Sequence, residues 1–203
     1  MPKDTFFNLP KDKQQKLITA IKNELSRVPF AQFSINQIIK EADIARGSFY
    51  QYFTDRFDML EYIMLQFRQE MQNQLIERLQ QNGGDLFDLF DFVFNCCIEM
   101  SQKEENGALY RNVMSDIKVN AEFYLKIKDT NRKKHNESNT LLIYINKKLL
   151  NIKNDQELHD LFYILKTLSI MAVAEAFMYV EQQEQIKQEY KRRLMLIKSN
   201  FER

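Results

Sequence analysis

Helix-breaking residues are rare along the whole of this chain, which contains only 4 glycines and 3 prolines among 203 residues. Turns and irregular segments draw heavily on these two residue types, so their scarcity favours long helices. Apolar side chains recur at intervals of three and four, as in Leu17, Ile21 and Leu25, and we find no alternation typical of a half-buried strand. The sequence therefore predicts an all-α protein of about nine helices.

Three short helices are expected first. Pro10 and Pro29 bound the first of them, because proline fits the first helical turn and cannot continue a helix. Ser34, three residues before Gln37, matches a capping box at the start of the second. The third covers about residues 45–53. Two short helices joined by a tight connection are the arrangement of a helix-turn-helix motif.

Longer helices follow this group. Thr54 is the expected N-cap of a fourth helix that runs to about residue 81, with Asp55 in its first turn. Asn82-Gly83-Gly84 is the clearest break in the chain. Beyond it, helices are expected at about residues 85–103, 108–118, 121–150, 155–181 and 183–201.

The third helix must have two faces if it is to lie in a DNA groove. Phe49 and Phe53, four residues apart, supply an inward face. The outward side would carry small and polar residues, namely Arg46, Gly47, Ser48, Tyr50 and Gln51. Arginine and glutamine form bidentate hydrogen bonds with guanine and adenine, and tyrosine hydroxyls donate to phosphates. The pattern indicates DNA binding, and the alternative is an ordinary solvated helix face.

The stretch FSINQIIKEADIARGSFYQYFTDRFDML, residues 33–60, resembles the DNA-binding domain of the tetracycline-repressor-like (TetR/AcrR) regulators. The matching slots are the turn Ala42-Asp43-Ile44, the helix start Arg46-Gly47-Ser48, the aromatic end Tyr50-Gln51-Tyr52-Phe53, and Arg56. Asp43 stands where the family has a turn glycine, and aspartate tolerates the left-handed backbone of such a turn. Ala45 replaces the usual polar cap of the third helix.

By position, the resemblance implies DNA contacts from the starts of the second and fourth helices as well as from the third. The complete set of expected DNA-binding residues is Ser34, Asn36, Arg46, Gly47, Ser48, Tyr50, Gln51, Tyr52 and Arg56. The alternative for Ser34 is a role only as a cap, and for Tyr52 only as a packing residue. Residues 1–56 carry 9 basic against 6 acidic side chains, which fits a phosphate-facing surface without demonstrating one.

The resemblance also implies two domains, a small helix-turn-helix DNA-binding domain at residues 1–56 and a larger helical ligand-binding and dimerisation domain at 57–203. The last two helices would pair with those of a second copy through Leu161, Leu165, Leu168, Ala172, Tyr190, Leu194 and Ile197. A palindromic site needs two helix-turn-helix units, which favours a homodimer. The alternative is that these side chains form an ordinary monomer core.

A ligand pocket is expected in the larger domain, and its lining has two interpretations. The candidates are Phe92, Cys96, Met100, Tyr110, Met114, Phe123, Tyr124 and Tyr163. The ligand of such a pocket would be largely apolar; otherwise these side chains are plain core. Glu175 lies within an apolar helix face, where a carboxylate is paired across an interface, points into a cavity, or reaches solvent at the edge.

Several other classes of protein are disfavoured. The adjacent Cys96 and Cys97 cannot close a loop, which favours reduced thiols in a cytoplasmic protein. We find no signal peptide and no apolar run of the ~18 residues that a membrane span needs. His135 and His159 lack metal-ligand spacing, and no nucleophile motif or phosphate-binding glycine loop occurs. We therefore expect no metal, no other cofactor and no enzymatic activity.

The leading hypothesis is a cytoplasmic, homodimeric repressor that a small, largely apolar ligand releases from a palindromic operator on double-stranded DNA. A second hypothesis is a DNA-anchored protein-interaction module without a small-molecule inducer. The third is an all-α enzyme with an accidental motif. The third predicts no salt-dependent DNA binding, whereas phosphate contacts require a steep dependence on salt.

Overall fold

The computed structural model describes residues 2–103, 107–119 and 140–203, and the regular structure of these residues is helical, which confirms the all-α prediction. The α-helices are α1 (Asp4–Phe7), α2 (Lys11–Arg27), α3 (Ile35–Ala42), α4 (Arg46–Tyr52), α5 (Arg56–Gln81), α6 (Leu86–Gln102), α7 (Gly107–Val119), α10 (Asp155–Met178) and α11 (Gln183–Phe201). Short 3-10 helices occupy Phe30–Gln32, Lys147–Leu149 and Val180–Gln182.

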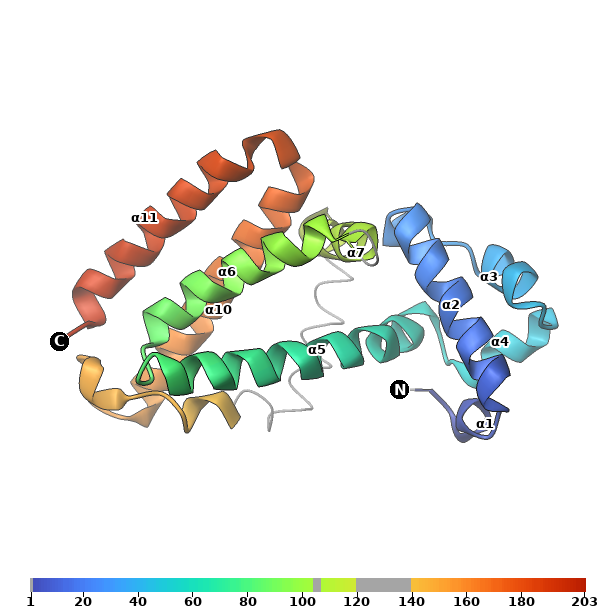
Figure 1. Cartoon of the computed structure of the whole chain (residues 1–203), viewed down its shortest axis with the longest axis horizontal. Coiled ribbons are helices and arrows are strands. Elements are labelled where there is room, and N and C mark those ends of the chain that lie inside the picture. The colour runs from blue at the N-terminus through green and yellow to red at the C-terminus, as the bar shows by residue number, and fades with distance from the viewer. Residues whose placement is uncertain (1, 104–106, 120–139) are drawn as a thin grey trace.

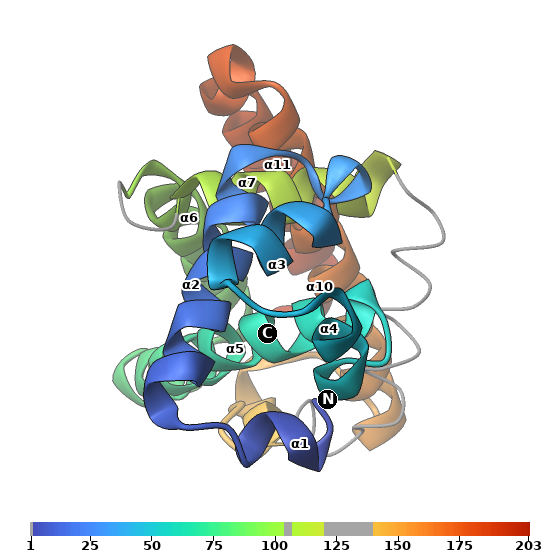
Figure 2. The same ribbon diagram turned by 90° about the vertical axis from the view of Figure 1, so that its right-hand side faces the viewer.

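The helices form an elongated molecule with a group at each end (Figure 1). α1–α4 lie together at one end, α6, α10 and α11 lie at the other, and the long α5 runs from the first group to the second. Figure 2 faces the first end and shows α3 and α4 toward the viewer, with α1 below them. α7 packs against both α2 and α10, so it joins the two groups a second time.

Two clusters of buried apolar side chains correspond to these groups. The first core contains Phe6, Phe49 and other side chains of α1–α4, together with the first turns of α5. Leu109 and Val113 of α7 are also part of it. The second core is built mainly from α6, α10 and α11, with Leu79 from the last turn of α5. α5 therefore contributes to both cores, and α7 is anchored in the first.

The start of α5 differs from the sequence prediction. Its N-cap is Asp55 rather than Thr54, because one carboxylate oxygen of Asp55 accepts the backbone N–H groups of Phe57 and Asp58, each at 2.8 Å. The backbone N–H of Thr54 donates in turn to the Asp58 carboxylate at 2.9 Å. Threonine and aspartate are both good caps, and here the carboxylate accepts two N–H groups at the positive end of the helix dipole.

The helix expected at 121–150 does not reach its predicted end. Residues 120–139 lie outside the described ranges, and the helical backbone ends at residue 142. The chain then turns onto the linker between α5 and α6, where the backbone N–H of Asn146 donates to the Gly84 carbonyl at 3.0 Å. Gly84 has φ +83°, and a Cβ there would lie 2.5 Å from the Asn146 nitrogen. This contact requires glycine.

One helix of the described chain, α10, is long and apolar enough to cross a membrane by length and composition, which the sequence analysis did not anticipate. Ten of its residues, among them Leu165 and Phe177, are buried. They pack in the second core against α6 and α11, where a helix must be apolar on most of its sides. Packing within the chain accounts for the apolar character of the buried part of α10.

Candidate nucleic-acid interface

The turn between α3 and α4 is built around Asp43. Its backbone is left-handed, with φ 55° and ψ 51°, and its N–H group bonds back to the carbonyls of the last turn of α3. The backbone N–H of Ile44 also donates to the Ile39 carbonyl, at 3.0 Å. This is a C-terminal cap in which glycine is common and aspartate is tolerated. The structure confirms that Asp43 replaces the expected turn glycine without loss of the turn.

The start of α3 is capped from two directions. Ser34 Oγ accepts the backbone N–H of Gln37 at 3.4 Å, which is the half of the capping box that the sequence predicts. The backbone N–H of Ser34 donates to Glu24 Oε1 of α2 at 2.9 Å. Glu24 is only 1% exposed, and its carboxylate also accepts two hydrogen bonds from the Arg27 guanidinium, at 2.8 and 2.9 Å. Our sequence analysis missed Glu24, although its place in the apolar spacing of α2 could have revealed it.

α4 presents the two faces that the sequence predicts. Phe49 on α4 and Phe53 just after it are fully buried in the first core. The opposite face is exposed at Arg46, Gly47 and Gln51, and Tyr50 is 52% exposed. Ser48 and Tyr52 are half-buried, and the Tyr52 ring packs against Phe6 of α1 with ring centroids 6.4 Å apart. Within the predicted set, Tyr52 is thus a packing residue at least in part.

Half-buried and exposed residues at the starts of α3, α4 and α5 meet around one shallow hollow of about 370 Å³, open to solvent. It is lined by Phe33, Ser34, Ile35, Asn36, Arg46, Tyr50 and Arg56. Five of these seven belong to the set expected to bind DNA. The lining has two arginines and no acidic side chain, so its charge favours a phosphate. The remaining members of the set, on α4 beside the hollow, are Gly47, Ser48, Gln51 and Tyr52.

Arg56, at the start of α5, is held in place by aromatic rings. Its guanidinium carbon lies 5.2 Å from the centroid of Phe30 and 5.2 Å from that of Phe57. These distances are within the range of cation–π attraction, which favours arginine because its planar group stacks on rings. The guanidinium is thereby fixed at the rim of the hollow, where its N–H groups can meet a phosphate.

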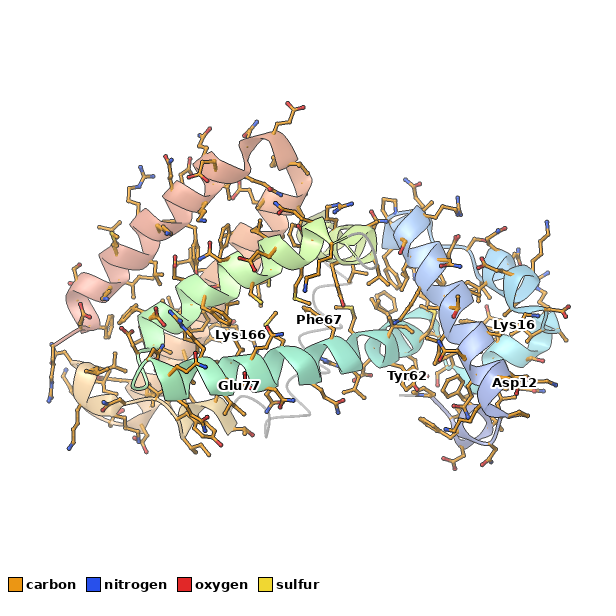
Figure 3. All side chains as sticks on the ribbon, in the orientation of Figure 1. Asp12, Lys16, Tyr62, Phe67, Glu77 and Lys166 are labelled. Atoms are coloured by element: carbon orange, nitrogen blue, oxygen red, sulfur yellow. The ribbon has the colours of Figure 1, made fainter. Side chains whose placement is uncertain are left out.

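Three of the residues expected to line a ligand pocket face α5. Cys96 Sγ of α6 donates to Gln74 Oε1 at 3.2 Å, and the Phe92 ring lies 5.4 Å from the Arg78 guanidinium carbon. Tyr110 of α7 packs on Phe67, with ring centroids 4.6 Å apart. Figure 3 shows Phe67 on the side of α5 that faces α6 and α7. These three candidates therefore lie along the helix that leads to the hollow.

The other pocket candidates are placed differently. Met100 is half-buried on α6, and Tyr163 is 53% exposed on the surface of α10. Glu175 is half-buried on α10. The Met114 side chain and residues Phe123 and Tyr124 lie outside what the structure describes. The structure therefore gathers part of the predicted lining along α5 and leaves Tyr163 on the surface.

The two cysteines are free thiols with low reactivity. Burial raises the pKa of Cys97 from 9.0 to about 12, and it raises the pKa of Cys96 as well. Because the thiolate is the reactive form of cysteine, both are poor nucleophiles at neutral pH. Among the residues that the structure describes, no group of three or more His, Cys, Asp or Glu side chains could hold a metal ion.

Most of the side chains predicted to form the dimer interface are buried within the single chain. Five of its residues are at most 6% exposed in the single chain, namely Leu161, Leu165, Ala172, Tyr190 and Leu194. The Tyr190 hydroxyl, for example, donates to the Phe90 carbonyl at 2.8 Å inside the second core. A side chain already buried in its own subunit has almost no surface left for a second one. Leu168 and Ile197 are half-buried, and α10 and α11 expose other apolar residues, namely Tyr163, Ile164, Met171, Met195 and Leu196.

Solved structures share this fold at low sequence identity. NemR of Escherichia coli in its reduced form is 16% identical, with a TM-score of 0.57, and the match covers 94% of this chain and 97% of that one. A putative regulator from Mesorhizobium loti is 10% identical with a TM-score of 0.54, over 95% and 98%. FadR of Bacillus subtilis, in complex with stearoyl-CoA, is 16% identical with a TM-score of 0.51, over 90% and 96%. A search of curated proteins gave no match.

Family models match both parts of the chain. Residues 17–63 match the DNA-binding model of the bacterial regulatory proteins of the tetR family, and this range contains α3, α4 and all seven residues that line the hollow. Residues 85–199, more than half of the chain, match the tetracyclin repressor-like C-terminal domain. Members of this family are transcriptional regulators rather than enzymes. The chain belongs to the TetR family of bacterial transcriptional regulators, with a DNA-binding helix-turn-helix in α3 and α4.

Proposed function

We propose that this protein is a homodimeric repressor in the cytoplasm, which binds a palindromic operator and leaves it when a small, largely apolar ligand binds. The observation that carries the proposal is the hollow where the starts of α3, α4 and α5 meet. Three helices that are separate in sequence bring Asn36, Arg46 and Arg56 to one exposed surface. DNA recognition requires such a convergence of donors for phosphates and bases.

In this proposal the nine residues divide into base contacts and phosphate contacts. Arg46 and Gln51 lie on the exposed face of α4 and would reach base edges in the major groove. Gly47 has no side chain, and its position is open, since a Cβ built there would meet no atom within 4 Å. The backbone of α4 could therefore come close to the DNA at this residue. The phosphates would be held by Ser34, Asn36, Ser48, Tyr50, Tyr52 and Arg56.

A second copy is needed because a palindromic operator has two half-sites about 34–36 Å apart. The exposed apolar residues of α10 and α11 support this assembly. Met195 and Leu196 are 66% and 64% exposed, and Tyr163 and Ile164 are 53% and 47% exposed. Burial of large apolar side chains is the main driving force of subunit association. We propose these residues in place of the buried set.

We propose that the ligand binds where α6 and α7 face α5, near Phe92, Cys96 and Tyr110. α5 begins at the hollow with Arg56 and ends in the second core with Leu79, so a change in its position would move a DNA-binding residue directly. Release from DNA then requires two positions of α5, one that fits the operator and one that does not. A ligand shifts the equilibrium between them only if it binds the two with different affinity. The FadR structure named above holds stearoyl-CoA, whose long apolar chain supports an apolar ligand class.

In the domain division that we propose, residues 1–56 bind DNA and residues 57–203 bind ligand and partner subunit. The first turns of α5, with Met59 and Ile63, then reach from the larger domain into the first core. The competing hypothesis, a protein-interaction module without an inducer, predicts that no apolar compound both stabilises the protein and releases DNA. A thermal-shift screen followed by DNA-release assays on the hits separates the two.

The test of the DNA interface is operator binding by variants with matched controls. An operator is first selected with the wild-type protein from random double-stranded DNA, and affinities are compared at fixed salt. Arg46→Ala and Gln51→Ala should each weaken binding by about 10-fold or more, since one bidentate base contact contributes about 1–3 kcal/mol. Arg203→Ala and Gln80→Ala, at exposed positions outside α11, should bind normally. Unchanged affinity in the first pair would refute the interface.

A further inference from the structure

The carboxy-terminal end of α4 is held by residues that come long before it in the chain. The last four carbonyl groups of a helix have no partner within that helix. In α4 these belong to Phe49, Tyr50, Gln51 and Tyr52. The Phe49 carbonyl accepts the backbone N–H of Phe53, the residue that follows α4, at 2.9 Å. Among the contacts that the structure describes, the other three carbonyls have no such donor at the end of α4.

The other three carbonyls are bonded by Lys3 and Thr5. The Lys3 ammonium donates to the Tyr50 carbonyl at 2.8 Å, and the Lys3 backbone N–H donates to the Tyr52 carbonyl, also at 2.8 Å. The hydroxyl of Thr5 donates to the Gln51 carbonyl. A cation at the negative end of a helix dipole is favourable in addition to its hydrogen bond. Every terminal carbonyl of α4 therefore has a partner.

Phe6 anchors the segment that supplies these donors. Its side chain is fully buried in the first core. Its ring centroid lies 5.4 Å from that of Phe53 and 5.2 Å from that of Tyr62 on α5, in edge and tilted arrangements that aromatic pairs prefer. α1 is thus fixed to the end of α4 and to α5 at once, and Figure 2 shows it beside α4. We call residues 3–6 the brace.

α4 depends on support of this kind. It is seven residues long, and a helix of this length is marginal without tertiary contacts. Its N-cap residue, Ala45, has no side-chain hydrogen bond to the helix. Two of the three carbonyls bonded by the brace belong to Tyr50 and Gln51, whose side chains lie on the exposed face of α4. The brace therefore sets the backbone from which those side chains project.

We propose that Lys3 and Thr5 are positioning residues for operator recognition, acting through the last turn of α4 rather than by touching DNA. The proposal rests on the proposed DNA-binding role of α4. The brace lies outside residues 17–63, the part that the family's DNA-binding model covers. The sequence pattern around Lys3 and Thr5 carries no sign of it, because the contacts join residues 46 and 47 positions apart.

The first arm of the test needs no DNA. Amide hydrogen exchange is measured on the full-length protein for the wild type, Thr5→Val and Thr5→Ser. Valine keeps the shape of threonine but has no hydroxyl, whereas serine keeps the donor. We expect exchange in residues 49–53 to be about fivefold faster in Thr5→Val, as loss of one hydrogen bond implies, and near wild-type in Thr5→Ser. α6 and α10 should exchange at wild-type rates in both variants. Equal protection of residues 49–53 in Thr5→Val would overturn the brace.

The second arm measures affinity for the selected operator and for unrelated DNA of the same length over a range of salt. Thr5→Val should bind the operator about fivefold more weakly for each subunit engaged, with unchanged affinity for unrelated DNA. Lys3→Met should weaken operator binding to a similar extent, and its dependence of log affinity on log salt should keep the wild-type slope. If Lys3 instead contacts a phosphate, its loss lowers the slope by about 0.9 per contact and weakens both DNAs, which would overturn the positioning role. If the wild type selects no operator, the proposed function fails, and the exchange arm still decides on the brace.

Discussion

The Glu24 carboxylate accepts the backbone N–H of Ser34 at 2.9 Å, which ties the start of α3 to α2. The same carboxylate is held by the Arg27 guanidinium at 2.8 Å. A buried acid therefore orients the start of α3, where Ser34 and Asn36 line the hollow that we propose to face DNA. Stability of the small helical group and geometry of the hollow depend on one side chain.

Replacement of Glu24 by alanine should destabilise the protein by about 2–4 kcal/mol. The change removes three hydrogen bonds and leaves the Ser34 N–H without its acceptor in a part-buried position. The measurement is urea denaturation followed by circular dichroism. The control is Glu41→Ala, which loses one exposed hydrogen bond to Asn23 and should cost less than about 1 kcal/mol. A similar small cost in both variants would show that Glu24 does not hold α3.

Arg56 should be sensitive to shape as well as to charge. Arg56→Lys keeps the charge but loses the planar group that stacks on Phe30 and Phe57, so we expect operator affinity to fall about 10-fold with an unchanged salt slope. Arg56→Ala should lower the operator affinity further. It should also reduce the slope of log affinity against log salt by about 0.9 for each phosphate contact removed. Titrations at several salt concentrations give both quantities. Equal affinities for Arg56→Lys and the wild type would show that charge alone matters at this site.

Two glycines should respond in opposite ways to alanine. Gly84→Ala places a Cβ 2.5 Å from the Asn146 nitrogen at φ +83°, and we expect a loss of about 2–4 kcal/mol in the free energy of unfolding. Gly47→Ala meets no atom within 4 Å and lies in a helix, so it should leave stability unchanged or raised. Because Gly47 faces outward, the same variant should bind the operator more weakly. Normal binding by Gly47→Ala would place the DNA farther from α4 than we propose.

The stability of the native state should fall at alkaline pH because of Cys97. Its pKa is raised from 9.0 to about 12, so the folded protein keeps a proton that the unfolded chain releases. The stabilisation is full below pH 9 and is lost as the pH rises from about 9 toward 12, by up to about 1.4 kcal/mol per pH unit. Cys97→Ala should show a shallower decline between pH 9 and 10.5 in urea titrations. Parallel declines in the two proteins would contradict this origin.

Local sequence patterns predicted much of the structure of α2–α4. The four-residue spacing of Phe49 and Phe53 placed them in the core, and the tolerance of Asp43 for positive φ preserved the turn. The cap of α5 was misassigned by one residue, since Thr54 and Asp55 are both capable caps and only the fold decides between them. The contacts of Lys3 with Tyr50 join residues far apart in sequence, which no periodicity reports.

Periodicity also failed to separate core from interface on the last two helices. α10 is apolar on most of its surface, so spacing alone does not say which side faces α6 and α11 and which is left exposed. Leu165 and Tyr163 are two residues apart, yet one is fully buried and the other is 53% exposed. Only the packing of the chain on itself makes this distinction, and it redirects the dimer prediction to a different set of side chains.

The redirected interface gives a clear expectation for Leu196. Its side chain is 64% exposed, so Leu196→Glu should leave the subunit folded and separate the dimer, because it places a charge in an apolar contact. Sedimentation equilibrium should then show a monomer with the helical circular dichroism of the wild type, and operator affinity should fall since one half-site alone is engaged. The paired variant is Leu194→Glu, two residues away and 6% exposed, which should unfold the chain. A Leu196→Glu protein that stays dimeric at micromolar concentration would exclude this face of α11 from the interface.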